Sequence, residues 1–445
     1  MAKREPNGRL RTLLTDARWS GQDFARAVNG VAAETGLTLR YDRTSVSHWL
    51  AGTRPPAHVV ALAAEALSRR TGRRVSPADT GLARPSGGRA RDRPGVEPNA
   101  ADALAADPPD PGAAHDAEAL LGEIPVYSSA WRPPGWPPPG GAAAAERPSG
   151  RIGAQQVEAA EAVLPVFRNA DMTFGSGQVR PALTRYLATT VAPWLRTGAA
   201  PAVRHRLLGC AARLAYTAGF LCFDSNQQGA AQAYYRAGLR LGQEAGDPQC
   251  WAPVLRAMSV QAHHLGHRKQ AWELAEGAAR EAGRLPSLQA AFVTGQLAVA
   301  EAGCGDRRAA LAHLGRAERL LERSTGQRAA IGDYHPAALA HQQAEALAAL
   351  GDGPGAISAL GASLRYRPPG ERRARAVTLA RLAELHLSQG HVERACATWH
   401  EMVDAAAQLD SARVDDALRR LRARLHPVRG NRTARALLAR VRALT

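Results

Sequence analysis

The feature that most constrains this chain is a repeat of about 40 residues in its second half, where each unit has an apolar helix, a short turn and a second apolar helix. The turns carry a small residue at Ser225, Gly266, Gly305, Gly351 and Gly390. Five residues later stand Ala230, Ala271, Ala310, Ala356 and Ala395. One helix pair cannot bury both of its faces alone, so the pattern predicts stacked pairs that share a continuous core.

Over about 205–408 this pattern resembles the tetratricopeptide repeat, with small residues in both helices of each unit. The turn spacings of 41, 39, 46 and 39 residues exceed the usual period of about 34 and predict longer helices. The signature Trp and Tyr of the family are missing. We expect two leading helices in 154–200 and closing helices in 412–443; a non-repeat helical bundle is the alternative.

A repeat array of this kind offers a concave groove lined by the first helices of its units. In the repeat register, six charged or imidazole side chains point into that groove: Arg256, His263, His264, His341, Glu345 and Glu384. Such a mixed lining favours a peptide or a protein segment as the ligand. We therefore expect the groove to bind a peptide or protein partner.

Near the other end of the chain, the stretch YDRTSVSHWLAGTRPP predicts a short helix with one polar face. Asp42 can cap its start, since a carboxylate accepts hydrogen bonds from the first free amides. Val46, Trp49 and Leu50 follow at helical spacing and predict a buried stripe. Gly52 and two prolines end the helix. The opposite face carries Arg43, Thr44, Ser45, Ser47 and His48.

Three further helices are predicted around this one, from LRTLLTDA, SGQDFARAVNGVAAE and HVVALAAEALSRRTG. Ser20 caps the second of these, with Asp23 three residues on. Short helices on a compact core, one of them presenting small polar donors, are what insertion into the DNA major groove requires.

Residues 9–80 resemble the helix-turn-helix of the Cro/phage-repressor (XRE) class, most specifically in S-V-S-x-W-x-x-G-x-R-x-P from Ser45 to Pro56. Gly21 stands where the family has glutamine, and the usual short turn is replaced by about a dozen extra residues. Together with the repeat array, the head resembles actinobacterial regulators of sporulation and antibiotic production. The resemblance implies DNA contacts from Arg43, Thr44, Ser45, Ser47, His48, Arg54, Ser20 and Gln22.

The charge of the chain is concentrated at its two ends. Residues 1–95 hold 17 Lys/Arg and 8 Asp/Glu, a net of +9, and residues 411–445 hold 10 Arg and 2 Asp, a net of +8. The residues between carry 30 charges of each sign. Basic ends around a neutral middle indicate a polyanion partner for at least one end. The basic tail fits either an end cap with a solvated face or a second polyanion contact.

Residues 84–150 predict a linker, because they hold 13 of the 29 prolines and lack apolar periodicity. A flexible coil of that length spans on the order of 45 Å. Tyr127, Trp131 and Trp136 are unusual for a linker. They indicate either packing against a neighbouring domain or a docking strip for a groove.

Signatures of enzymes and metal sites are weak or missing. The stretch GSGQVR lacks the Lys-Ser/Thr of a phosphate-binding loop, and there is no HExxH and no GxSxG. His263 and His267 share a helical face without an acidic partner nearby. The five cysteines form no CxxC pair, and no run of 18 uncharged apolar residues is present. We expect no enzyme activity, cofactor or membrane contact, and a cytoplasmic, nucleoid-associated location.

The sequence thus predicts an all-α protein with three parts: a helix-turn-helix head in 1–83, a linker in 84–150 and a tetratricopeptide-like domain in 151–445. The expected function is regulation of transcription through double-stranded DNA, modulated by a partner of the array. A non-enzymatic scaffold whose head contacts protein is the alternative. We also expect a homodimer joined through 151–445, since one small head reads few base pairs.

Overall fold

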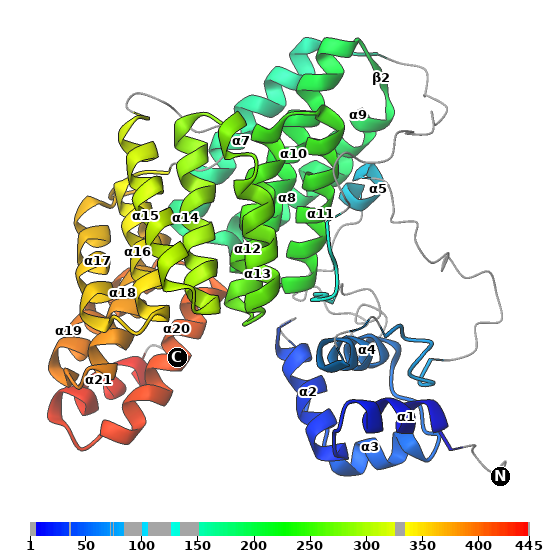
Figure 1. Cartoon of the computed structure of the whole chain (residues 1–445), viewed down its shortest axis with the longest axis vertical. Helices are drawn as coiled ribbons and strands as arrows, with labels where there is room; N and C mark the ends of the chain where they lie inside the picture. Colours follow the sequence, from blue (N-terminus) through cyan, green and yellow to red (C-terminus); the bar gives the residue numbers. More distant parts are fainter. Residues whose placement is uncertain are drawn as a thin grey trace.

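The computed structural model describes residues 6–34, 37–71, 73, 75–83, 100–105, 126–133, 151–324 and 334–443. In these residues the regular structure is helical apart from β1 (Arg151–Ile152) and β2 (Gly198–Ala199), which pair in parallel. A small helical head lies beside a larger array of stacked helices (Figure 1). The predicted fold class, all-α with a helical head and a solenoid-like array, is confirmed.

The head consists of α1 (Gly8–Asp16), α2 (Gly21–Ala33), α3 (Arg43–Leu50) and α4 (Ala57–Thr71). Trp49 lies at the centre of its core, with its ring 6.1 Å from that of Phe24 and 5.0 Å from that of Tyr41. Val46 is fully buried, and Leu50 packs against the same cluster. The apolar stripe expected on this helix therefore anchors α3 in the head.

The array begins with α7 (Ala154–Phe174), α8 (Ser176–Tyr186), a π-helical turn at Leu187–Val191 and α9 (Ala192–Arg196). Helix pairs then follow one another. They are α10 (Pro201–Asp224) with α11 (Gln228–Ala245), α12 (Pro248–His264) with α13 (Arg268–Ala279), α14 (Ser287–Cys304) with α15 (Arg307–Glu322), α16 (Pro336–Ala349) with α17 (Gly353–Tyr366), α18 (Arg372–Ser388) with α19 (Val392–Ala406), and α20 (Ala412–Leu425) with α21 (Arg432–Ala443).

The turn within each predicted unit needs a left-handed backbone, which glycine adopts without strain. The four turn glycines have φ between 79° and 89°. The sequence register predicted Ser225 at this position in the first unit. In the structure the left-handed residue there is Asn226 (φ 58°). The small residues of that unit are accordingly Ala231 and Gly219. A Cβ on Gly219 would lie 2.5 Å from the ring of Tyr235, so this helix pair packs too closely for any side chain there.

Helix α10 is apolar and long enough to cross a membrane, but 89% of its apolar stretch is buried inside the array. Its composition is that of a core helix, packed against α7, α8 and α11. At the other end, α21 buries Leu437 and Val441 against α19 and leaves arginines on its outer side. The basic tail is thus a closing helix pair with a charged outer face.

The array curves far enough for its last units to reach its first helices. Arg373 at the start of α18 lies 3.0 Å from Asp171 of α7 and 3.4 Å from Asp224 of α10, and all three side chains are buried. Asn226 donates a hydrogen bond to Asp416 of α20. These contacts close the interior of the array with α20 (Figure 1).

Two parts of the predicted linker are packed against the domains. Helix α5 (Ala100–Ala105) lies against α9 and α11. The segment 126–133, called the strap below, packs Val126 on the head core and Trp131 on the array core. These two segments do not coil freely, because their apolar residues cover a neighbouring surface. For Tyr127 and Trp131 the structure shows packing against a neighbouring domain, the first of the two alternatives. Trp136 lies outside the described residues.

Candidate functional site

The polar face predicted on α3 is open to solvent. Arg43, Thr44, Ser47 and His48 are exposed, and Arg54 is exposed just beyond the end of the helix. In the described part of the chain, their side chains form no hydrogen bond or ion pair with other residues. The first turn of α3 contains no acidic residue. The structure therefore leaves these five side chains available for a partner.

The other three predicted contact residues form hydrogen bonds at the starts of α2 and α3. The Ser45 hydroxyl donates to Asp42 at 2.9 Å and the Ser45 amide donates to the same carboxylate, which forms a capping box. These hydrogen bonds lower the pKa of Asp42 and keep the cap ionised. Ser20 donates to Asp23 at 2.6 Å in a second capping box, confirming the predicted cap of α2. The Gln22 side chain accepts from the Arg43 amide at 3.2 Å.

The long connection before α3 is anchored by Asn29, which the sequence analysis missed. Its side chain donates to the Tyr41 carbonyl at 2.9 Å and accepts from the Tyr41 amide at 3.0 Å. One side-chain amide thus satisfies both backbone groups of the residue before the cap. The signal in the sequence was an asparagine in the last turns of an otherwise apolar helix, which has a poor helix propensity.

The orientation of the head leaves α3 accessible. Figure 1 shows α4 on the side of the head nearest the array and α3 on the side away from it. On α4, Glu65 accepts from the Ser129 amide of the strap at 2.9 Å, and Arg69 donates to the Tyr127 carbonyl at 3.3 Å. Arg69 also forms ion pairs with Glu34 at 2.7 Å and Glu65 at 2.8 Å. The strap therefore attaches the head through the face opposite α3.

On the array side, the strap is fixed by α11 and α13. Tyr127 is buried, its ring lies 5.5 Å from that of His267 with a 4° angle between the planes, and its hydroxyl donates to Gln270 at 2.7 Å. The Ser128 amide and carbonyl both bond the Gln232 side chain at 2.9 Å. Burial lowers the pKa of His267 to about 4, so the stacked imidazole is neutral at physiological pH.

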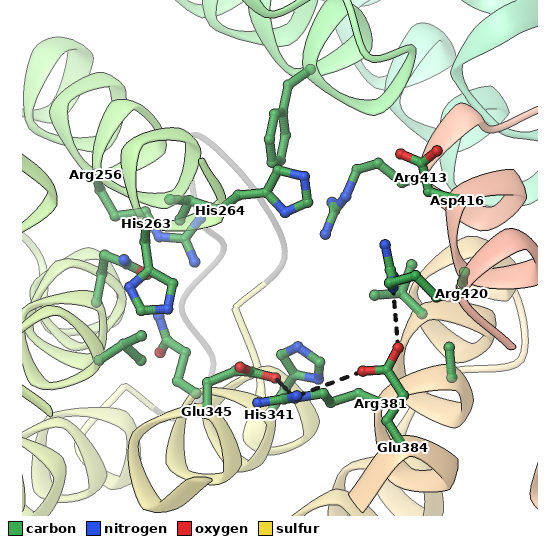
Figure 2. Close-up of a pocket in the computed structure, with 18 residues that line it drawn as sticks. Arg256, His263, His264, His341, Glu345, Arg381, Glu384, Arg413, Asp416 and Arg420 are labelled. Atoms are coloured by element: carbon green, nitrogen blue, oxygen red, sulfur yellow. Dashed lines mark hydrogen bonds and ion pairs between the residues drawn. The ribbon is translucent and has the colours of Figure 1, made fainter. Parts of the chain in front are cut away.

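The six residues predicted to line a groove share one cavity of about 370 Å³ inside the array. Every lining residue belongs to the first helix of a pair, as the repeat register requires. The lining residues come from α10, α12, α14, α16, α18 and α20, and Figure 2 shows the labelled charged and imidazole side chains of four of these helices around the cavity. The predicted members are Arg256, His263, His264, His341, Glu345 and Glu384. Five further lining residues were not predicted from the repeat register: Phe223, Arg381, Arg413, Asp416 and Arg420.

The carboxylates of this cavity are neutralised by arginines within the array. Arg381 lies 3.0 Å from Glu345 and 3.6 Å from Glu384, and Arg420 lies 3.1 Å from Glu384 (Figure 2). Asp416 pairs with Arg419. These pairs connect α16, α18 and α20 across the cavity wall, which fixes the wall's geometry.

The histidines of the cavity are neutral at physiological pH. Burial lowers the pKa of His264 to about 3, assisted by Arg413 and Arg420. Burial likewise lowers the pKa of His341 to about 4. His263 on α12 lines the cavity, whereas His267, the cap residue of α13, packs against the strap. The described residues hold no group of three or more His, Cys, Asp or Glu side chains arranged to bind a metal.

Comparison with known proteins informs the head alone. Residues 10–83 match the family of SP15 N-terminal domains. The matched range ends where the predicted head ends and includes α2, α3 and α4 entirely. No curated protein matches the chain.

Proposed function

We propose that this protein is a sequence-specific DNA-binding regulator of transcription, acting in development or secondary metabolism, whose repeat domain binds a peptide or protein. The observation that carries the proposal is the exposed polar face of α3 on a head of net charge +6, with 13 Lys/Arg and 7 Asp/Glu in residues 1–83. Unpaired polar side chains at the start of a short, firmly anchored helix suit the major groove. The basic charge of the head favours approach to a polyanion.

The contacts of α3 in the structure suggest which of its residues bind bases and which bind phosphates. Thr44, Ser47 and His48 have free side-chain donors and acceptors for base edges. Arg43 and Arg54 lie at the two ends of the helix, where a guanidinium meets phosphates. Ser20 fixes the start of α2 and Ser45 fixes the start of α3, so we assign them a positioning role, since their hydroxyls already bond carboxylates.

The array acts on the head through the strap. His264 ends α12 and lines the cavity, and His267, three residues on, caps α13 and stacks on Tyr127, so the turn between α12 and α13 connects the ligand space with the strap. A ligand that shifts this turn changes the packing of Tyr127 and hence the position of the head. The array thereby couples occupancy of its cavity to the placement of α3 on an operator.

The test begins with selection of bound sequences from a random DNA pool by the full chain, which defines an operator. The double variant Ser47→Ala, His48→Ala is then compared with wild type by gel shift. We expect it to lose about 1–3 kcal/mol of specific binding for each base contact removed, with nonspecific binding largely retained. The control is Thr12→Ala, Thr15→Ala, exposed hydroxyls of α1 that bond only their own helix backbone.

Two results would count against the proposal. The first is a pool with no enriched sequence and no salt-dependent binding to duplex DNA, which favours a scaffold whose head contacts protein. The second is a Ser47, His48 variant that binds the operator as tightly as the control.

A further inference from the structure

We propose that the cavity inside the array binds the acidic group of its ligand, a carboxylate or a phosphate, between Arg256 and Arg413. This inference rests on the proposed function, because it assigns a chemistry to the ligand that modulates the head. The two arginines come from α12 and α20, and both line the cavity (Figure 2).

Arg256 and Arg413 have no carboxylate partner among the residues that line the cavity. Four arginines line it, against three carboxylates, and each carboxylate already has an arginine partner. Arg381 and Arg420 are used by Glu345 and Glu384. Asp416 forms an ion pair with Arg419, which does not line the cavity. The cavity therefore carries positive charge that its own acidic residues do not neutralise.

Arg413 is held over an aromatic ring rather than by a carboxylate. Its guanidinium carbon lies 4.7 Å from the centre of the Phe223 ring, and among the described residues no acidic group is within ion-pair distance. Burial lowers the pKa of Arg413, and the charge of Asp224 offsets this only in part. A desolvated cation without an anionic partner is costly, so an anion that enters beside it gains a strong interaction.

Arg256, on the opposite wall of the cavity, also lies over an aromatic ring and has no carboxylate partner in the described part of the chain. Its guanidinium lies 4.0 Å from the centre of the Phe292 ring, and its Nε is buried without a hydrogen-bond partner among the described residues. With the Gln342 amide turned, its oxygen accepts from Arg256 at 3.3 Å. A neutral amide leaves the charge uncompensated. Two arginines on opposed helices, each over a ring, form a preorganised site for an anion.

The histidines between them add polar contacts without adding charge. His264 lies edge-on to Phe223, with 5.3 Å between the ring centres, and Figure 2 shows it turned toward the same space as Arg413. A neutral imidazole both donates and accepts, so it can bond an acidic group or its neighbouring amide. Val260 and Val299 supply apolar lining for the body of the ligand.

The size of the cavity sets the class of ligand. A volume of about 370 Å³ is at the lower end of small-molecule sites and cannot admit a folded domain. The acidic group therefore arrives on a small organic acid or phosphate, or on the end or side chain of a short peptide. These sources present the same chemistry to Arg256 and Arg413, and the experiment separates them.

The experiment is calorimetric titration of the full-length chain, without DNA, with three probes: inorganic phosphate, succinate and the tripeptide acetyl-Leu-Glu-Leu with a free carboxyl end. Ionic strength is matched with sodium chloride to remove general salt effects. The variants are Arg413→Gln and Arg256→Gln. The control is Arg424→Gln, an exposed arginine on the same helix as Arg413. Thermal melting by circular dichroism confirms that each variant is folded.

We expect at least one probe to bind wild type and the control equally, and to bind each cavity variant roughly 10-fold to 100-fold more weakly. The probe that binds best identifies the source of the acidic group. Because the arginines stand on different helices, one remains testable if the other variant does not fold. No binding of any probe to wild type, or equal binding to all variants, overturns the proposal. Neither result depends on DNA, so a failure here is distinct from a failure of the head to bind an operator.

Discussion

Replacing Arg373 by methionine should destabilise the array more than any surface substitution and should do so in a pH-dependent way. Arg373 lies between Asp171 and Asp224, at 3.0 Å and 3.4 Å, and 4.7 Å from the centre of the Phe220 ring. The two carboxylates are 4% and 0% exposed, so neither can turn to water when the guanidinium is removed. Methionine keeps most of the volume and removes the charge.

The magnitude follows from leaving two buried carboxylates without a cation. Breaking one buried ion pair by removing a partner costs about 3–5 kcal/mol, and here one arginine serves two partners. We therefore expect a loss of about 5 kcal/mol in the free energy of unfolding at pH 7.5. Arg280→Met removes an exposed pair with Glu276 and should cost less than about 1 kcal/mol.

The pH dependence gives the sharper test. Burial raises the pKa of Asp171 above its unfolded value, and Arg373 opposes that rise. Without Arg373 the pKa of Asp171 rises further. A carboxyl with a raised pKa destabilises the folded state at high pH, and the penalty disappears as the pH falls through the folded pKa toward the unfolded value of about 3.9. The deficit of Arg373→Met should therefore shrink between pH 7.5 and pH 5.

Urea denaturation of the full chain at the two pH values measures this, with the array transition followed by circular dichroism. The triple variant Asp171→Asn, Asp224→Asn, Arg373→Met removes all three charges and should recover much of the lost stability. A loss that is the same at both pH values, or no larger than that of Arg280→Met, would refute the account of Arg373 as the clamp that closes the array.

Three further outcomes are expected. Gly219→Ala should lower the free energy of unfolding by about 1–3 kcal/mol, measured by thermal melting, because the added Cβ overpacks against Tyr235. Gly277→Ala, whose Cβ would make only an ordinary contact at 3.4 Å, should be neutral or stabilising. Equal effects of the two substitutions would contradict the close packing at Gly219. Tyr127→Ala should weaken docking of the strap by about 2–4 kcal/mol and speed hydrogen exchange of the Ser128 and Ser129 amides, which bond Gln232 and Glu65, and unchanged exchange rates would argue against docking. Light scattering should show 151–445 as a dimer and 1–83 as a monomer, and a monomeric array would remove the basis for paired heads on two half-sites.

Much of the structure of the head could be predicted from short sequence patterns. A helix cap, an apolar stripe and a glycine exit act within a few residues, so the bounds of α3 and its cap at Asp42 follow from the sequence. The assignment of polar residues was less complete. Ser45 and Ser20 were predicted as DNA contacts, yet their hydroxyls bond carboxylates of their own caps. The same residue types serve both purposes, and only the tertiary structure shows which side chains are already bonded; DNA contact by Ser20 and Ser45 stays a prediction.

The lining of the cavity was likewise predicted only in part. The repeat register placed Arg256, His263, His264, His341, Glu345 and Glu384 on first helices, and the structure brings all six together. Their role in binding a partner remains a prediction. In the first unit the register predicted from small residues is off by one residue, because the turn position is held by Asn226, which like glycine tolerates a left-handed backbone.

By itself, the sequence determined the four helices of the head, the caps of α2 and α3, and the helix pairs of the array with the inward face of their first helices, because these depend on contacts a few residues apart. Only the tertiary structure decided that the array curves until Arg373 meets Asp171 and that Arg413 faces Phe223. It also decided that the strap docks between the head and the array. The curvature of a solenoid is the sum of small rotations between successive pairs, each set by side-chain packing, and no local pattern in the sequence encodes that sum.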